Sequence, residues 1–237
     1  MAERLLLHIG TQKSGTTYLQ RVLEKLAIGL RKHDVLYPIR LSGRKQIYNH
    51  EPASYGLLGR EHYPWVPQSR VDAEQPSWEV LVDKVRRHSG IAIVSGEAIS
   101  VVRHGAAKRL VDALGVDDTR ILITARDLGR VIPSSWQQHI RNGRSSKLGA
   151  YIQSLAKQRP GDDLDALEAL WESDGDLTFW RAYAIGSLVH RWQQIVGPDR
   201  VTVVTVPDRS AGPDALWHRF REALGLTLAT RRAWFWS

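Results

Sequence analysis

The chain has 237 residues, a length typical of one large domain. It contains no cysteine, which excludes disulfides, thiolate metal sites and a cysteine nucleophile. Its 33 basic and 25 acidic residues give a net charge of +8, which favours anionic partners over cationic ones, although a solvated basic surface explains the charge equally well.

The first apolar run, residues 5–9, is short and nearly continuous, as is typical of a buried strand in a parallel sheet. It leads through residues 10–17 into a predicted helix over 17–30. A turn between a strand and a helix N-terminus presents backbone N–H groups and a partial positive charge. Lys13 adds a full charge, and three neighbouring residues add hydroxyl groups. We interpret this turn as a cradle for phosphate or sulfate, the alternative being an ordinary turn with a solvated lysine.

Residues 41–75 are polar, rich in proline, glycine, tyrosine and histidine, and lack a clear period. We expect a long irregular excursion there. Its aromatic residues either line a pocket or form a local aromatic–proline cluster. They are Tyr48, Tyr55, Tyr63 and Trp65.

A second buried strand is predicted over residues 91–94 and is followed by the sequence SGE. Glu97 therefore lies at the carboxyl end of a strand, the side of a parallel sheet on which ligands bind. If this strand neighbours the first one, Glu97 lies near Lys13. Its structural alternative is to cap the following helix or to pair with Arg103.

A third strand is predicted over residues 121–124. Arg126 stands at its end, and Ser134 lies eight residues further on. We expect Ser134, which a proline precedes, to open a helix, where its hydroxyl can meet an anion. The guanidinium of Arg126 offers a planar, two-pronged match to phosphate. The alternatives are an ion pair at the strand end and a simple helix cap, and Ser135 is a weaker substitute for Ser134.

The remaining elements complete an alternation of strands and helices. Helices are predicted over residues 76–87, 106–114, 134–141, 164–171, 183–196 and 214–224, and a strand over 201–206. Such alternation indicates right-handed crossovers and a three-layer α/β/α fold with a central parallel sheet. We expect one domain over residues 1–237. Its end, TRRAWFWS, either docks back on the domain or marks a chain that is cut short.

The turn after the first strand is not a Walker A motif, G-x-x-x-x-G-K-[ST]. Gly10 and Gly15 have the required separation, but residue 16 is threonine and the lysine is Lys13. This favours an anion cradle that does not depend on bound magnesium. A P-loop small-molecule kinase that uses ATP and magnesium is the second interpretation.

The sequence TQKSGTTYLQ resembles the 5′-phosphosulfate loop of the sulfotransferase superfamily, whose usual form is P-K-[ST]-G-T-T-x-[LW], with Gln12 where many members have proline. The resemblance implies a P-loop-like α/β fold, 3′-phosphoadenosine 5′-phosphosulfate (PAPS) as co-substrate, and no metal. It implies three groups of donor-binding residues: Lys13, Ser14, Gly15, Thr16 and Thr17 at the 5′-phosphosulfate, Tyr18 near the adenine, and Arg126 with Ser134 at the 3′-phosphate.

In-line sulfuryl transfer also needs charge stabilisation on the leaving oxygen and a base for the acceptor hydroxyl. The resemblance implies that Lys13 has the first role. For the second it implies Glu97, since several carbohydrate-type sulfotransferases use a glutamate. His62 and His104 are weaker candidates for the base, and His8, within the first strand, is interpreted as a core histidine.

The chain departs from many cytosolic sulfotransferases because it lacks a late R-K-G loop with G-x-x-G-x-x-K. Only Arg231 and Arg232 form a late basic pair. Either the chain belongs to a bacterial-type or carbohydrate-type branch, or part of a C-terminal lid is missing. A non-catalytic domain that binds nucleotides or polyanions is the third interpretation.

The expected partner is an acceptor with a hydroxyl, carried by a small molecule, a sugar or a lipid. Nucleic acid is not expected, because no basic stripe with interleaved aromatic residues occurs. The start MAERLLLHIG is too short in its apolar part for a signal peptide, and no run of about 18 apolar residues occurs. We therefore expect a cytoplasmic protein without a membrane span.

Overall fold

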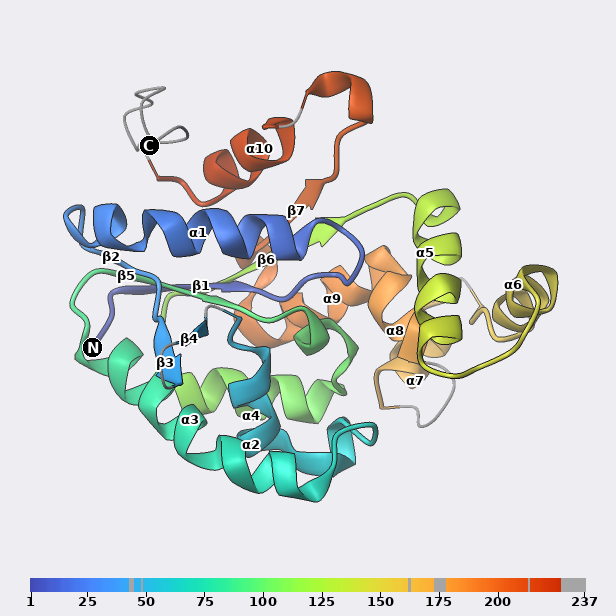
Figure 1. Ribbon diagram of the computed structural model, residues 1–237, viewed down its shortest axis with the longest axis horizontal. Coiled ribbons are helices and arrows are strands. Elements are labelled where there is room, and N and C mark those ends of the chain that lie inside the picture. Colours follow the sequence, from blue (N-terminus) through green and yellow to red (C-terminus); the bar gives the residue numbers. More distant parts are fainter. Residues whose placement is uncertain (43–44, 48, 162, 173–177, 213, 227–237) are drawn as a thin grey trace.

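A five-stranded parallel sheet forms the centre of the computed structural model, which describes residues 1–42, 45–47, 49–161, 163–172, 178–212 and 214–226 (Figure 1). The strand order is β2-β5-β1-β6-β7. The strands are β1 (Arg4–His8), β2 (Val35–Leu36), β5 (Ile91–Ser95), β6 (Thr119–Ala125) and β7 (Val201–Thr205). A separate antiparallel hairpin joins β3 (Arg40–Ser42) and β4 (Lys45–Ile47).

Helices cover both faces of this sheet (Figure 1). One face carries α1 (Thr16–Arg31) and α10 (Ala215–Ala223). The other carries α2 (Glu51–His62), α3 (Gln68–Arg87), α4 (His104–Leu114) and α9 (Ile185–Val196). A further group gathers on the side where β1 leads into α1: α5 (Leu128–Arg141), α6 (Leu148–Lys157), α7 (Leu164–Glu172) and α8 (Thr178–Tyr183). Short 3₁₀ turns are η1 (Glu97–Val101), η3 (Pro198–Arg200) and η4 (Arg209–Ala211). The predicted three-layer α/β/α fold is confirmed.

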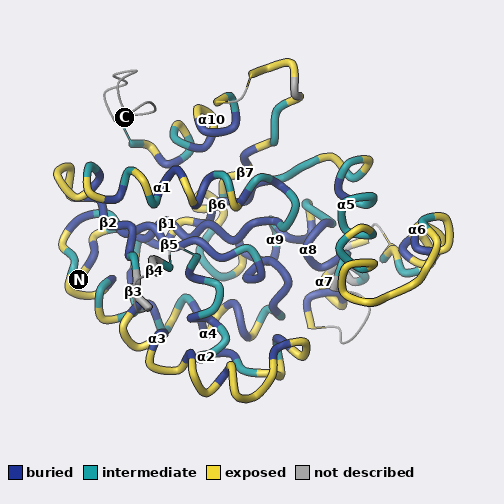
Figure 2. Tube along the Cα trace, viewed as in Figure 1, coloured by how far each residue is buried: buried dark blue, intermediate teal, exposed yellow. Residues whose placement is uncertain are grey.

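Two hydrophobic clusters lie on opposite faces of the sheet. Leu5 and Leu7 of β1 face the cluster with α2, α3, α4 and α9, whereas Leu6 faces the cluster with α1 and α10. All three leucines are buried, and the sheet forms the buried centre in Figure 2. The central strands β1, β5 and β6 contain nearly continuous apolar runs because helices cover both of their faces, whereas the edge strand β7 is largely exposed.

The four long predicted strands are confirmed within one or two residues, whereas the expectation of an irregular excursion over residues 41–75 is wrong. That stretch holds the hairpin, α2 and the first part of α3. The helical period of α2 is interrupted where Gly59 adopts φ 64°, and Pro76 lies inside α3 rather than at its start. Both features weaken the helical signal in the sequence. The two helices form nevertheless because α2 and α3 pack against each other.

None of the described helices combines the length and the apolar composition needed to cross a membrane. The segment TRRAWFWS lies outside the described residues. The expectation of one domain stays a prediction.

Candidate functional site

The turn that follows β1 is sharply curled. Lys13 has φ 63° and Gly15 has φ 85°, both in the left-handed region that side chains with a Cβ rarely adopt. Gly15 is the N-cap of α1, and no side chain caps this helix or places a carboxylate in its first turn. The N-terminal N–H groups and the positive end of the α1 dipole therefore face the turn, as an anion site requires. We name residues 10–16 the phosphate-binding loop, after the role that the sequence predicts for them.

Buried hydrogen bonds hold this loop from the inside. The Thr11 N–H donates to the Thr124 carbonyl (2.7 Å), and the Ser14 Oγ lies 2.6 Å from the Thr124 Oγ1. The Ser14 hydroxyl also donates to the Thr11 carbonyl. Ser14 is fully buried and its hydroxyl has its partners inside the protein, so this side chain supports the shape of the loop.

The loop and the end of β6 meet. An Nη1 proton of Arg126 is donated to the Lys13 carbonyl (3.2 Å), and the Lys13 ammonium donates to the Oε1 of Gln138 on α5 (3.1 Å). Within the described part of the chain, the buried Nε of Arg126 has no hydrogen-bond partner. A buried donor without an acceptor is unfavourable, so an anion beside Arg126 would stabilise this arrangement.

Ser134 does not open a helix, so that expectation is wrong. α5 begins at Leu128, where Asp127 caps it by accepting the Arg130 N–H (2.9 Å), and Ser134 lies in its second turn, half-buried. Ser134 precedes Gln138 by one helical turn, so both lie on one face of α5. Since Gln138 reaches Lys13, this face is turned toward the loop.

Ser135 contributes to a different contact. Tyr183 of α8 donates its phenol proton to the Gln12 carbonyl (3.0 Å) and accepts a hydrogen bond from Ser135. Burial raises the pKa of Tyr183, so the phenol stays protonated and available as a donor. This bridge ties the loop to both α5 and α8.

Glu97 lies directly against the loop. β5 pairs with β1 in register His8↔Ser95, so the two strands are neighbours, which was the condition for placing Glu97 near Lys13. The Thr16 hydroxyl donates to the Oε2 of Glu97. A Cβ at Gly10 would lie 2.9 Å from the Glu97 carbonyl oxygen, so the close approach of these two backbones requires glycine.

A second carboxyl beside Glu97 escaped the sequence analysis. Glu51, at the start of α2, accepts the Ala98 N–H on its Oε2 (3.0 Å) and the Tyr55 hydroxyl on its Oε1. Burial raises the pKa of Glu51, the bond from Tyr55 lowers it, and the Glu97 charge raises it again. Glu51 could have been identified from a helix-start signal, because proline follows it directly and its carboxylate lies in the first turn of α2.

One of the three histidines considered from the sequence lies in the core, and the other two lie away from the phosphate-binding loop. His8 is fully buried, so its interpretation as a core residue is confirmed. His62 lies at the end of α2, 3.5 Å from Glu61, and His104 stacks on Trp171 of α7 with ring centroids 5.5 Å apart. Burial lowers the pKa of His62 and of His104. Of the candidate bases, Glu97 is the one that hydrogen-bonds a loop residue.

The aromatic residues of the 41–75 stretch form a cluster. Tyr63 is buried and makes edge contacts with Tyr55 and Trp65, at centroid distances of 4.9 and 5.5 Å. This arrangement favours the aromatic–proline cluster over a lined pocket. Tyr48 lies outside the described residues.

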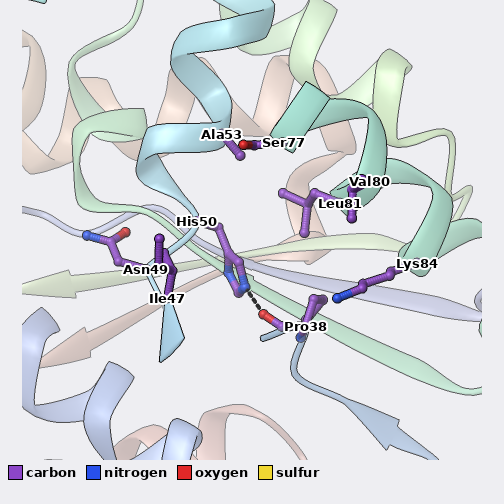
Figure 3. Close-up of a pocket in the computed structure, with 9 residues that line it drawn as sticks. All are labelled: Pro38, Ile47, Asn49, His50, Ala53, Ser77, Val80, Leu81 and Lys84. Atoms are coloured by element: carbon purple, nitrogen blue, oxygen red, sulfur yellow. Dashed lines mark hydrogen bonds between the residues drawn. The ribbon is translucent and has the colours of Figure 1, made fainter. Parts of the chain in front are cut away.

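A small, mostly apolar pocket opens beside the carboxyl end of β2, between the hairpin, α2 and α3 (Figure 3). At its base the ring of His50 donates from Nε2 to the Pro38 carbonyl (2.5 Å) and accepts the Ser95 N–H on Nδ1 (2.9 Å). Lys84 reaches the rim, where it donates to the Ile39 carbonyl (2.8 Å). The pocket thus lies on the same edge of the sheet as Glu97, one strand further out.

No group of three or more histidine and carboxylate side chains in the described ranges is placed to hold a metal ion. The chain matches no protein-family model, and no curated protein matches it. Among solved structures it is similar to a sulfotransferase from Alicyclobacillus acidocaldarius, at 20% sequence identity and a TM-score of 0.52. The likeness covers 96% of this chain and 82% of that protein's chain. At this identity it shows a shared fold, that of a sulfotransferase-like α/β/α domain, and fold alone does not fix chemistry.

Proposed function

We propose that the protein is a PAPS-dependent sulfotransferase that transfers a sulfuryl group to an acceptor hydroxyl. The observation that carries the proposal is the 3.2 Å hydrogen bond from Arg126 to the Lys13 carbonyl. It brings together, at adjacent strand ends, the two elements that would hold the two phosphates of one nucleotide. The sulfotransferase-like fold adds support.

The donor would lie across this junction. The N–H groups of the phosphate-binding loop and of α1 would bind the 5′-phosphosulfate, with Thr16 and Thr17 adding hydroxyl donors. Arg126, with its unpartnered Nε, and Ser134 would bind the 3′-phosphate. Tyr18 would lie near the adenine. Its ring is half-buried, and its hydroxyl donates to Asp214, the residue that precedes α10 (3.3 Å).

Transfer then needs three events at these residues. The acceptor oxygen forms a bond to sulfur while the bond from sulfur to the 5′-phosphate oxygen breaks. Lys13, whose ammonium donates to Gln138, stabilises the negative charge on the departing phosphate. Glu97 takes the acceptor proton, and the leaving group is adenosine 3′,5′-bisphosphate.

The acceptor would approach from the side of Glu97, η1 and α2. The apolar pocket beside Pro38 and His50 lies on this side, which supports an acceptor with a small apolar part next to its hydroxyl (Figure 3). Small molecules, sugars and lipids all include such acceptors. Independence of metal and a cytoplasmic location are part of the same proposal.

A thermal-shift comparison of two ligands tests this function. Adenosine 3′,5′-bisphosphate is expected to raise Tm in proportion to the logarithm of its concentration above Kd, without metal. Stabilisation by ATP with magnesium and not by the bisphosphate would contradict the proposal and favour a kinase. Stabilisation by the bisphosphate, with no release of it from PAPS in the presence of a panel of hydroxyl acceptors, would favour a non-catalytic nucleotide-binding domain.

A further inference from the structure

A buried chain of hydrogen bonds runs beneath the phosphate-binding loop. The amide of Gln20 on α1 donates to the Ser95 Oγ (3.1 Å), which lies 2.9 Å from the Nδ1 of His8. The Nε2 of His8 lies 3.2 Å from the Thr124 Oγ1. These four side chains come from α1 and from three adjacent strands, and none exposes more than 2% of its surface.

This chain of hydrogen bonds ends at Ser14, within the phosphate-binding loop. The Thr124 Oγ1 lies 2.6 Å from the Ser14 Oγ, and the Ser14 hydroxyl bonds to the Thr11 carbonyl. A carbonyl only accepts, so Ser14 uses its single proton there. Thr124 must then donate to Ser14, and its own oxygen must accept a proton from His8.

These hydrogen bonds determine which neutral tautomer the His8 ring adopts. The Nε2 of His8 carries a hydrogen, and its Nδ1 accepts the hydroxyl proton of Ser95. In the other neutral tautomer, a lone pair on Nε2 would face the Thr124 oxygen, whose proton is already used. Burial also lowers the pKa of His8 to about 3, which keeps the ring neutral.

We propose that His8 is a positioning residue for the phosphate-binding loop, acting through Thr124 on Ser14. The Nε2–H of His8 orients the Thr124 hydroxyl, which holds Ser14 against Thr11 and so fixes the bend that aims the loop N–H groups. The two hydrogen-bonding partners of the ring, Ser95 and Thr124, carry no charge, and neither does Phe220, whose ring makes an edge contact with it at a centroid distance of 4.9 Å. This inference rests on the proposed function only for the identity of the ligand that the loop binds.

The tautomer is measured first, on the full chain labelled with ¹⁵N-histidine. The ring nitrogens of His8 are expected to give the Nε2–H signature, unchanged from about pH 5 to about pH 9. An Nδ1–H signature, or a titration near the ordinary histidine pKa, would overturn the proposed chain. This readout needs no ligand and no activity.

Substitutions in β6 then separate positioning from stability. Thr124→Val removes the linking hydroxyl, and Thr124→Ser keeps it. Thr119→Val is the matched control, because Thr119 is equally buried at the other end of the strand and donates to the Val116 carbonyl (2.6 Å). Amide hydrogen exchange across residues 10–16 is expected to accelerate about tenfold in Thr124→Val only. Equal loop exchange in Thr124→Val and Thr119→Val would overturn the role.

Binding of adenosine 3′,5′-bisphosphate is measured on the same variants by calorimetry. Thr124→Val is expected to weaken it about tenfold, with Thr124→Ser and Thr119→Val close to wild type. Equal affinity in Thr124→Val and wild type would overturn the positioning role. If the wild type does not bind the bisphosphate at all, the proposed function fails, while the tautomer and the exchange data still decide the role of His8.

Discussion

The hydroxyl of Thr16, the first residue of α1, donates a hydrogen bond to the Oε2 of Glu97, the first residue of η1. A hydroxyl has one proton, so Thr16 cannot hold Glu97 and donate to a bound phosphate at the same time. Donor binding that recruits this hydroxyl therefore frees the Glu97 carboxylate for the acceptor. The two halves of the proposed reaction are coupled through a single proton.

Glu97→Gln tests this coupling. An amide cannot take the acceptor proton, so transfer is expected to fall by about 10²- to 10⁴-fold. Affinity for adenosine 3′,5′-bisphosphate is expected to stay the same or to rise, because a neutral amide holds the Thr16 hydroxyl less strongly than a carboxylate does. Steady-state kinetics and calorimetry measure the two effects. Glu61→Gln, an exposed carboxylate at the end of α2, is the matched control, and wild-type turnover by Glu97→Gln would exclude Glu97 as the base.

Lys13→Ala is expected to lower transfer by about 10²- to 10³-fold or more, because in the proposed mechanism the charge on the departing phosphate would lose its stabilising ammonium. Tm is expected to change little. Alanine also carries a Cβ, so the φ of 63° is no more strained, and the side chain loses one hydrogen bond, to Gln138. Lys25→Ala, exposed on α1, controls for loss of a charge. Normal turnover by Lys13→Ala would refute the assignment.

The sheet and the centre of the site could be predicted because their signals are local. Apolar runs bounded by polar residues indicate the buried strands, and the glycine–lysine turn after β1 indicates an anion site by composition alone. Glu97 could be placed because a parallel sheet brings the carboxyl ends of its strands to one edge.

The supporting contacts could not be predicted, because they join residues far apart in sequence. Gln138 contacts Lys13 across 125 positions, and Tyr183 contacts Gln12 across 171, and no local pattern encodes either pairing. The start of α5 also differs from the prediction. Pro133 looks like a helix start in sequence, but Asp127 caps the helix earlier and the proline is accommodated inside it.

Stability is expected to fall as the pH falls below about 6.5. Burial lowers the pKa of His50 to about 4 and that of His8 to about 3, from an ordinary value of 6.5. Between these values the unfolded chain binds more protons than the folded one. The free energy of unfolding should therefore decrease by up to about 1.4 kcal/mol per pH unit for each histidine.

Urea unfolding at a series of pH values measures this slope. His50→Gln is expected to reduce it, whereas His33→Gln, on the exposed turn after α1, should leave it unchanged. A free energy of unfolding that stays constant across this range would show that the buried rings do not resist protonation.

Arg191 is expected to stabilise the segment that carries Glu97. Its fully buried guanidinium donates to the carbonyls of Ser100 and Val102, each at 2.8 Å, and burial lowers its pKa to about 9. Arg191→Met should lower the free energy of unfolding by about 3 kcal/mol, because the carbonyls at the end of η1 lose their donors. Arg200→Met, exposed and bonded to one carbonyl, is the comparison in urea unfolding. Equal losses in the two variants would contradict the role of Arg191.

Recognition of the 3′-phosphate is the central claim, and calorimetry with adenosine 3′,5′-bisphosphate and with adenosine 5′-monophosphate tests it most directly. The wild type is expected to bind the bisphosphate at least about tenfold more tightly, since in the proposed site Arg126 would pair with the additional phosphate. Arg126→Ala should abolish this preference and leave monophosphate binding in place, and Arg120→Ala, exposed on the same strand, should change neither. Equal affinity of the wild type for both nucleotides, or a preference that survives in Arg126→Ala, would contradict the account.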